Sequence, residues 1–180
     1  MKVAIFGGSF DPPHIGHESI VHEALKQLSI DKCVIVPTFL SPFKKDFFLE
    51  PNKRLFLLQK LFKNKKNIDI CDFEISKKRA VFSIETVKYL QQLYKADTLY
   101  LIIGADNLEK LHLWHDYEEL KTLVTFVVAN RSGYLNDNYD NIQTLNVNLN
   151  ISSTNLRESL DLNYIPKNIK EDVKLYWQNR

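Results

Sequence analysis

The sequence predicts an α/β fold in which a doubly wound parallel sheet carries helices on both of its faces. Short runs that are apolar at every position recur along the chain, as is typical of parallel strands buried on both sides. Segments with helical apolar spacing separate these runs, as in repeated strand–helix–strand units. The 180 residues show no linker, repeat or low-complexity tract. We therefore expect residues 1–180 to form one domain.

In the first half of the chain, strands are predicted at Lys2–Phe6, Cys33–Val36 and Ile68–Phe73. A helix between the first two strands would face inward with Ile20, Val21, Ala24, Leu25 and Leu28. Pro51 can open a second helix, which would face inward with Leu55, Leu58, Leu61 and Phe62. Thr38–Glu50 has no clean period and is predicted to be a loop.

In the second half, Ser83 is predicted to be the N-cap of a helix that carries Val87, Leu90 and Tyr94. Further strands are predicted at Thr98–Ile103, at Val124–Ala129 and through the alternating residues Leu145, Val147 and Leu149. Further helices are predicted around Tyr117–Leu120, near Thr154–Leu160 and near Asn168–Trp177. The polar, Asn-rich segment Arg131–Asn141 is predicted to be an exposed loop. The resulting order of elements is that of a Rossmann-like sheet.

Composition argues against several classes of protein. Hydrophobic residues make up 44% of the chain, which is enough for a sizeable core and unlike a disordered chain. The formal net charge is only +2, whereas a dedicated nucleic-acid-binding domain is usually strongly basic. No apolar stretch reaches the length of a membrane span, and Lys2–Phe6 is too short for a signal peptide.

Cys33 and Cys71 stand far apart without metal-binding spacing, as expected of reduced thiols. We therefore expect a cytoplasmic protein that binds neither nucleic acid nor a membrane. The sequence leaves its oligomeric state open, a homo-oligomer included.

Ligands of a doubly wound sheet bind beyond the carboxyl ends of its strands, where the strand order reverses. Polar chemistry concentrates in three segments that follow predicted strands: Gly7–His17, Gly104–Trp114 and Ile151–Arg157. We expect these segments to form the functional site.

Gly7–His17 joins the first strand to the first helix and reads GGSFDPPHIGH. Its glycines let a ligand approach the backbone, and the helix N-terminus offers free N–H groups and a positive dipole end to an anion. His14 and His17 are three residues apart, so both imidazoles can converge near that terminus. The segment therefore predicts a phosphate site; a tight turn with two incidental surface histidines is the alternative interpretation.

Three rival motifs fail on spacing. A P-loop needs a Lys-Ser/Thr pair after its second glycine, and a dinucleotide fingerprint needs GxGxxG, but Gly7 and Gly8 are adjacent. His17, Glu18 and His22 resemble a zinc-protease helix at first sight. However, five residues turn His22 about 140° away from His17, so the two cannot share a metal. His22 is predicted to face solvent or to pack.

Ile151–Arg157 places hydroxyl side chains at the predicted start of a helix, namely Ser152, Ser153 and Thr154. Such residues are good helix caps and good phosphate ligands. Arg157 lies one turn further and offers a planar fork to phosphate oxygens. An ordinary capped helix is the alternative interpretation of this segment alone.

Two of these segments identify a superfamily. Gly7–His17 closely resembles the GxFDxxHxGH signature of the adenylyltransferase branch of the HxGH nucleotidyltransferases, and Ile151–Arg157 resembles their second signature, ISSTxxR. Ile103–Leu120 is similar to the IGxDxLxxLxxWxxxxxL stretch of nicotinate-nucleotide adenylyltransferases. Shorter segments resemble that family's P-x4-P-H-K loop, its YTxxT segment and its RxG loop: 37–44, 82–86 and 131–133.

The resemblance implies transfer of the adenylyl group of ATP to nicotinate mononucleotide in NAD synthesis. It implies Mg²⁺ bound mainly through ATP phosphates and no metal site on the protein. The implied catalytic residues are His14, His17, Lys44 and Arg157. The implied ATP-binding residues are Gly7, Gly8, Ser9, Phe10, Gly16, Gly104, Asp106, Ile151, Ser152, Ser153 and Thr154. The implied mononucleotide-binding residues are Ser83, Thr86, Trp114, His115 and Arg131.

The chain departs from the family pattern at a few positions. Phe43 stands where the family usually has His, so that loop depends on Lys44. Val81, Phe82 and Ser83 replace Ser, Tyr and Thr. Two alternatives stay open at this point: a pantetheine-phosphate adenylyltransferase, against which the Trp-containing stretch argues, and a nucleotide-binding module without turnover.

Overall fold

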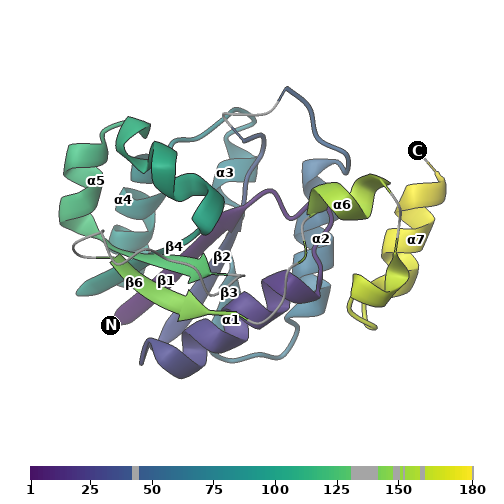
Figure 1. The fold of residues 1–180 in the computed structure, drawn as a ribbon, viewed down its shortest axis with the longest axis horizontal. Coiled ribbons are helices and arrows are strands. Elements are labelled where there is room, and N and C mark those ends of the chain that lie inside the picture. Colours follow the sequence, from purple (N-terminus) through teal and green to yellow (C-terminus); the bar gives the residue numbers. More distant parts are fainter. Residues whose placement is uncertain (42–44, 131–141, 148–150, 152, 159–160, 180) are drawn as a thin grey trace.

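The computed structural model describes residues 1–41, 45–130, 142–147, 151, 153–158 and 161–179. Within these residues, six parallel strands form one sheet in the order β3-β2-β1-β4-β5-β6 (Figure 1). Their bounds are Lys2–Gly8 (β1), Lys32–Pro37 (β2), Ile68–Ile70 (β3), Thr98–Gly104 (β4), Thr125–Asn130 (β5) and Ile142–Asn146 (β6). The predicted doubly wound α/β fold is confirmed.

The strand order reverses between β1 and β4. In the register, Phe6 of β1 pairs with Ile35 of β2 on one side and with Ile102 of β4 on the other. The parallel strands β1 and β4 end at Gly8 and Gly104, so the segments that follow them leave the sheet at the same edge. This is the position at which a parallel sheet leaves a crevice for a ligand.

Alternating side chains of the buried strands enter two separate cores. Ala4 and Phe6 face a core shared with α1 (Ile15–Gln27), α2 (Pro51–Leu61), α6 (Ser153–Glu158) and α7 (Lys170–Gln178). Val3 and Ile5 face a second core shared with α4 (Ser83–Tyr94), the 3₁₀ helix η1 (Ala105–Leu113) and α5 (Tyr117–Leu123). The short helices α3 (Phe73–Ser76) and η2 (Leu162–Tyr164) complete the described elements.

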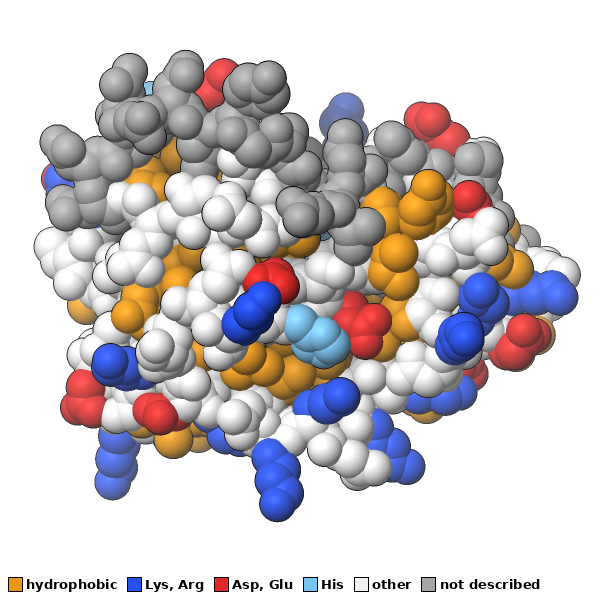
Figure 2. All heavy atoms as spheres, turned by 60° about the horizontal axis from the view of Figure 1, so that its bottom comes forward, with side chains coloured by type: hydrophobic (Ala, Val, Ile, Leu, Met, Phe, Trp, Pro, Cys, Tyr) orange, Lys and Arg blue, Asp and Glu red, His pale blue; other side chains and the backbone are white. Residues whose placement is uncertain are grey.

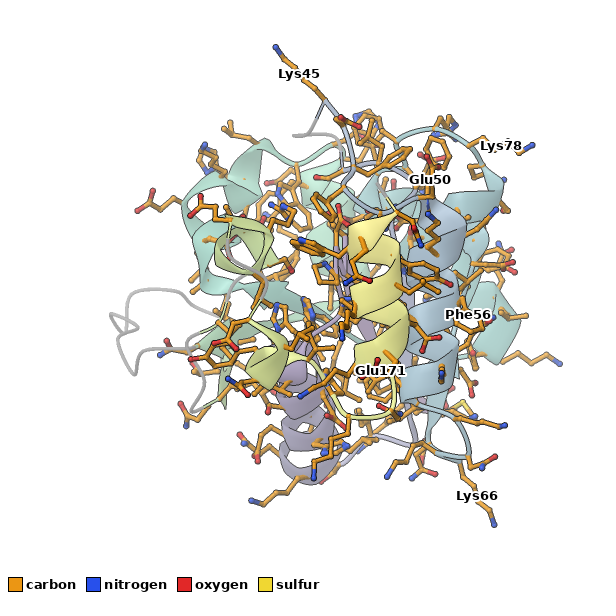
Figure 3. All side chains as sticks on the ribbon, turned by 90° about the vertical axis from the view of Figure 1, so that its right-hand side faces the viewer. Lys45, Glu50, Phe56, Lys66, Lys78 and Glu171 are labelled. Atoms are coloured by element: carbon orange, nitrogen blue, oxygen red, sulfur yellow. The ribbon has the colours of Figure 1, made fainter. Side chains whose placement is uncertain are left out.

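The C-terminal helix α7 lies beside α2 (Figure 3). Lys60 of α2 forms an ion pair with Asp172 of α7, and the side-chain amide of Asn168 donates to the carbonyls of Lys60 and Leu61 at the end of α2. Trp177 of α7 packs on Phe48, with 4.2 Å between ring centroids. The end of the chain therefore supports the segment that precedes α2.

Most predicted strand ends lie within two residues of the observed ones, and three further boundaries differ from the structure. The third strand ends at Ile70 and not at Phe73, because Phe73 already begins α3. The N-cap of α4 is Phe82, so Ser83 is the first residue of the helix and not its cap. The last strand begins at Ile142, before the predicted alternation at Leu145, because its backbone pairs with β5 from Phe126 onward. Arg131–Asn141 and Leu149 lie outside the described residues.

No helix among the described residues is long and apolar enough to cross a membrane. On the face shown in Figure 2, Lys and Arg side chains are distributed among acidic and uncharged ones. This agrees with the balanced net charge of +2.

Candidate active site

The two histidines of the first segment lie stacked at the start of α1. His14 is the N-cap, and its Nδ1 accepts from the N–H of Gly16 at 3.2 Å. Nδ1 of His17 accepts from the N–H of His14, also at 3.2 Å. The two ring centroids are 3.7 Å apart at an interplanar angle of 27°. Since both Nδ1 atoms accept, each neutral ring carries its proton on Nε2, where it can donate to a phosphate oxygen.

Gly16 and Gly8 are required by close packing. A Cβ on Gly16 would lie 3.0 Å from two ring atoms of His14, so the glycine between the histidines makes room for the cap. A Cβ on Gly8 would lie 3.2 Å from the ring of Phe10. Phe10 is buried at a φ of 49° and packs edge-on against His17, with 4.8 Å between centroids.

Gly7 differs from these two glycines. A Cβ on Gly7 would meet no heavy atom within 4 Å, and the residue is exposed. The backbone at the end of β1 is therefore open to a ligand.

The second motif docks directly on the first. Nη1 of Arg157 donates to the carbonyl oxygen of Asp11 at 2.9 Å, and its Nη2 donates to Oγ1 of Thr154 at 3.0 Å. Oγ of Ser153 donates to the carbonyl of Pro12 at 3.4 Å. Ile151 is buried, with its Cβ 3.8 Å from the position that a Cβ on Gly16 would take. Two segments more than 130 residues apart in sequence thus form one polar surface at the start of α1, as the motifs predict.

The middle segment follows β4 along the same edge. Gly104 ends β4, and a Cβ there would lie 2.3 Å from Oδ1 of Asp106, whose side chain is exposed. The side-chain amide of Asn107 donates to the carbonyl of Gly104 at 3.5 Å. Trp114 ends η1, is half-buried against the second core, and carries a buried Nε1 that donates to none of the described residues.

Trp114–Asp116 connects η1 to α5. Asp116 adopts a left-handed conformation with a φ of 51° and is the N-cap of α5, which begins at Tyr117.

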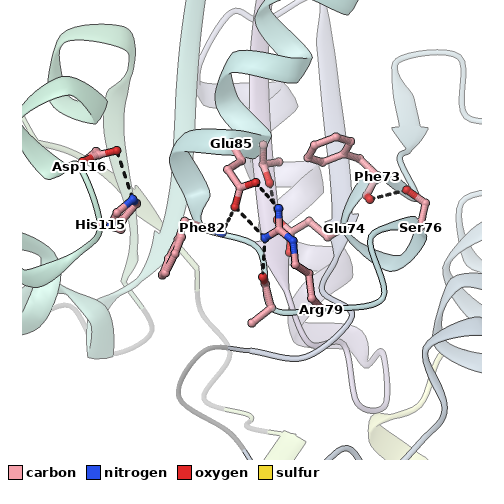
Figure 4. Close-up of polar contacts among 10 residues, drawn as sticks. Phe73, Glu74, Ser76, Arg79, Phe82, Glu85, His115 and Asp116 are labelled. Atoms are coloured by element: carbon pink, nitrogen blue, oxygen red, sulfur yellow. Dashed lines mark hydrogen bonds and ion pairs between the residues drawn. The ribbon is translucent and has the colours of Figure 1, made fainter.

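The start of α4 lies beside this connection (Figure 4). The rings of Phe82 and His115 stack with 4.3 Å between centroids, and both side chains are substantially exposed. Arg79 forms a two-pronged ion pair with Glu85, and Oε1 of Glu85 also accepts from the N–H of Phe82 at 3.1 Å. This ion pair holds the turn before α4 and lowers the pKa of Glu85 to about 2, mainly through its hydrogen bond to Arg79.

Thr86 is placed differently from Ser83. Thr86 is buried, and its hydroxyl donates to Oε1 of Glu74 at 2.6 Å. Burial raises the pKa of the Glu74 carboxyl to about 7. The Thr86 hydroxyl is thus engaged between α3 and α4 and is not available to a mononucleotide, whereas the half-buried Ser83 lies at the helix start.

Known proteins of one family are similar to this chain over nearly its whole length. Residues 5–159 match the family model described as cytidylyltransferase-like. A protein of Aliarcobacter butzleri with the name "probable nicotinate-nucleotide adenylyltransferase" is 52% identical over 173 residues, which cover 96% of this chain and 95% of that protein. A protein of Campylobacter jejuni with the same name is 50% identical over 179 residues, which cover 99% and 97%. The chain belongs to the nicotinate-nucleotide adenylyltransferase family.

Solved structures share the fold of this family member. The nicotinic acid mononucleotide adenylyltransferase of Plasmodium falciparum, complexed with APC, aligns with a TM-score of 0.78 at 22% identity and covers 97% of this chain and 96% of that one. Its complex with NaAD aligns with a TM-score of 0.73, also at 22% identity, over 98% and 93%.

Sequence reasoning missed two residues of this adenylyltransferase site. Both carboxylate oxygens of Asp11 accept backbone N–H groups, from Phe48 and Leu49, at 2.7 Å each. Arg54 of α2 is 1% exposed, and its guanidinium binds carbonyls of two loops at this edge, the one after β1 and the one between β2 and α2. A signal for Arg54 was present, because it shares the inward spacing i, i+3, i+4, i+7 with buried leucines: Leu57, Leu58 and Leu61.

The donor set is suited to anions more than to a protein-bound metal. Among the residues that the structure describes, no group of three or more His, Cys, Asp or Glu side chains is arranged to hold a metal ion. The carboxylate of Asp11, which lies in the loop before the two histidines, already accepts two backbone N–H groups. Three expected site residues, Lys44, Arg131 and Ser152, lie outside the described residues, as does Phe43.

Proposed function

We propose that this nucleotidyltransferase moves the adenylyl group of ATP to nicotinate mononucleotide, giving deamido-NAD and pyrophosphate. The observation that supports this most strongly is the stacked pair of His14 and His17, which follows the same loop after β1 that Arg157 binds through the carbonyl of Asp11. N–H donors at the switch point of the sheet would suit a triphosphate. The full-length similarity to nicotinate-nucleotide adenylyltransferases supports the choice of acceptor.

The reaction is an in-line displacement at the α-phosphorus of ATP. An oxygen of the mononucleotide 5′-phosphate forms the new bond to this phosphorus while the bond to the bridging oxygen of pyrophosphate breaks. The nucleophile is already an anion, so no general base and no covalent intermediate are needed. Catalysis then depends on positioning two polyanions and on stabilising the charge of the departing pyrophosphate.

Different residues are assigned to different phosphates of ATP. We assign His14 and His17 to the α-phosphate, because both rings lie at the N-terminus of α1 and both Nδ1 atoms accept backbone N–H groups, which leaves Nε2 as the N–H donor of a neutral ring. Arg157, Ser153 and Lys44 are assigned to the β- and γ-phosphates. Mg²⁺ would arrive with ATP and neutralise charge on its phosphates, with few or no direct protein ligands.

The acceptor is assigned to the surface between α4 and η1. The contact between Phe82 and His115 brings the first turn of α4 beside Trp114, which can offer a flat face to a pyridine ring. The hydroxyl of Ser83 and the positive end of the 12-residue α4 favour a carboxylate on that ring. Arg131 is assigned to the same substrate from its place in the sequence.

A product assay tests the proposal against its alternatives. The protein is incubated with ATP and Mg²⁺ and, in separate reactions, with nicotinate mononucleotide, with phosphopantetheine or without acceptor. The proposal expects pyrophosphate and a dinucleotide with the mass of deamido-NAD in the first reaction only. Product with phosphopantetheine alone would indicate the pantetheine-phosphate enzyme, and ATP binding without pyrophosphate in any reaction would indicate a non-catalytic module.

A further inference from the structure

Arg54 is an unusual residue to find inside this fold. It lies on the sheet-facing side of α2 among buried leucines and is 1% exposed. Burial lowers the pKa of its guanidinium, while the negative charges of Asp11 and Glu50 raise it. Arginine remains charged in proteins, so the fold holds a buried cation at the carboxyl edge of the sheet.

The N–H groups of the guanidinium donate to loop carbonyls. Nη1 donates to Ser9 at 2.6 Å and to Thr38 at 2.8 Å, Nη2 donates to Phe39 at 2.9 Å, and Nε donates to Leu49 at 2.9 Å. Ser9 follows β1, Thr38 and Phe39 follow β2, and Leu49 precedes α2. One side chain therefore joins the loop after β1 to both ends of the connection between β2 and α2.

Asp11 joins the same two loops a second time. Its carboxylate accepts from the N–H groups of Phe48 and Leu49, and its carbonyl accepts from Arg157. Leu49 is thus held through its carbonyl by Arg54 and through its N–H by Asp11. Arg54, Asp11 and Arg157 form one network beneath and beside the loop 9–13, from which the stacked histidines follow.

We propose that Arg54 is a positioning residue for adenylyl transfer, which fixes the loop after β1 so that Ser9 and the start of α1 meet the ATP phosphates in register. This inference rests on the proposed function. Arg54 does not touch substrate, because it is buried and four of its five N–H groups donate to carbonyls. A lysine at this position would keep the charge but lose the planar fork that reaches several carbonyls at once.

The test compares Arg54→Lys with Lys60→Met, which removes an exposed cation and its ion pair from the same helix. Thermal denaturation establishes which variants are folded at the assay temperature. For folded protein, we expect Arg54→Lys to lower kcat at least tenfold and to weaken binding of a non-hydrolysable ATP analogue at least fivefold. The KM of Arg54→Lys for nicotinate mononucleotide should stay within twofold of the wild-type value. For Lys60→Met, the kcat, the analogue affinity and this KM should all stay within twofold of wild type. A folded Arg54→Lys protein with wild-type kcat and analogue affinity would overturn the proposal.

A second variant covers the case in which Arg54→Lys does not fold. Arg54→Ala is prepared with methylguanidinium at roughly 20–50 mM, far below denaturing concentrations. This cation has the planar guanidinium group that the variant lacks. We expect the added cation to restore both the melting temperature and the analogue affinity. Recovery of the melting temperature without recovery of the affinity would overturn the proposal, and so would failure of every variant to fold, because Arg54 would then serve the fold as a whole. Analogue binding is measured independently of the acceptor, so a wild-type protein without turnover contradicts the proposed function and not this inference.

Discussion

Nη1 of Arg157 donates to the carbonyl oxygen of Asp11 at 2.9 Å, although 146 residues separate the two in the sequence. Through this bond the last motif of the chain holds the loop that leads from β1 to the stacked histidines. The surface proposed to bind the phosphates is therefore one unit, and changes at either end should have separable effects on chemistry and on ATP binding.

Replacing His17 by Ala should lower kcat by about 10²–10³, the scale of one lost donor at a developing charge. His14→Ala should also reduce turnover strongly, and in addition should lower the melting temperature, because His14 is the N-cap of α1 and is 1% exposed. Loss of such a cap typically costs about 1 kcal/mol. Steady-state kinetics and thermal denaturation measure the two effects.

His22→Ala is the matched control, since His22 is exposed on the same helix and should leave kcat unchanged. A folded His17→Ala protein that keeps more than a third of the wild-type kcat would remove His17 from the mechanism.

Arg157→Ala should raise the KM for ATP well above any change in the KM for the mononucleotide. The guanidinium, which the proposed function assigns to the ATP phosphates, binds Asp11 and Thr154. Lys167→Ala removes an exposed cation from the same end of the chain and serves as the control. An effect confined to the mononucleotide would mean that the two substrates have been assigned the wrong way round.

Glu74→Gln should stabilise the protein above pH 7. The pKa of Glu74 rises from 4.5 to about 7 through burial, so the folded state holds a proton that the unfolded chain has released. Stability attributable to this group is full below pH 4.5 and is lost as the pH rises to 7. The cost of the buried carboxylate above pH 7 is on the order of 3 kcal/mol. Gln can still accept the hydrogen bond from Thr86.

Urea denaturation of wild type and Glu74→Gln at pH 4.5 and pH 8 measures this difference. Glu74→Gln should have a higher free energy of unfolding than wild type at pH 8 and the same free energy of unfolding at pH 4.5. Glu85→Gln should instead lower the free energy of unfolding, because the hydrogen bond to Arg79 stabilises the charged Glu85 carboxylate and lowers its pKa to about 2. An equal gain for Glu74→Gln at both pH values would show that the carboxyl is not titrating in this range.

Much of this site could be predicted because its signals are local. The glycines, the paired histidines and the hydroxyl-rich helix start each follow a strand within a few residues, and the parallel sheet brings such ends to one edge. Arg54 could not be assigned in this way, because its partners come from the loop after β1 and from both ends of the connection between β2 and α2. Thr86 was misjudged for a similar reason: its hydroxyl meets Glu74, a contact that only the packing of α3 on α4 creates.

Trp114→Ala should raise the KM for the mononucleotide while leaving the KM for ATP within about twofold. The ring is half-buried at the end of η1, beside the stacked pair of Phe82 and His115. Trp114→Phe keeps a flat aromatic face and should retain most of the affinity. An unchanged mononucleotide KM in a folded Trp114→Ala protein would mean that the ring binds elsewhere and that Trp114 only packs the core.

The most direct test of the central claim is the ratio of kcat/KM for nicotinate mononucleotide to that for its amide, measured side by side through pyrophosphate release. Donors at the start of α4 suit a carboxylate, whereas an amide turns its NH₂ toward at least one of them and leaves it unpaired, at a cost of about 1–3 kcal/mol. The account therefore predicts a preference for the acid of roughly 5- to 150-fold. Equal efficiencies for the two mononucleotides, or a preference for the amide, would contradict it.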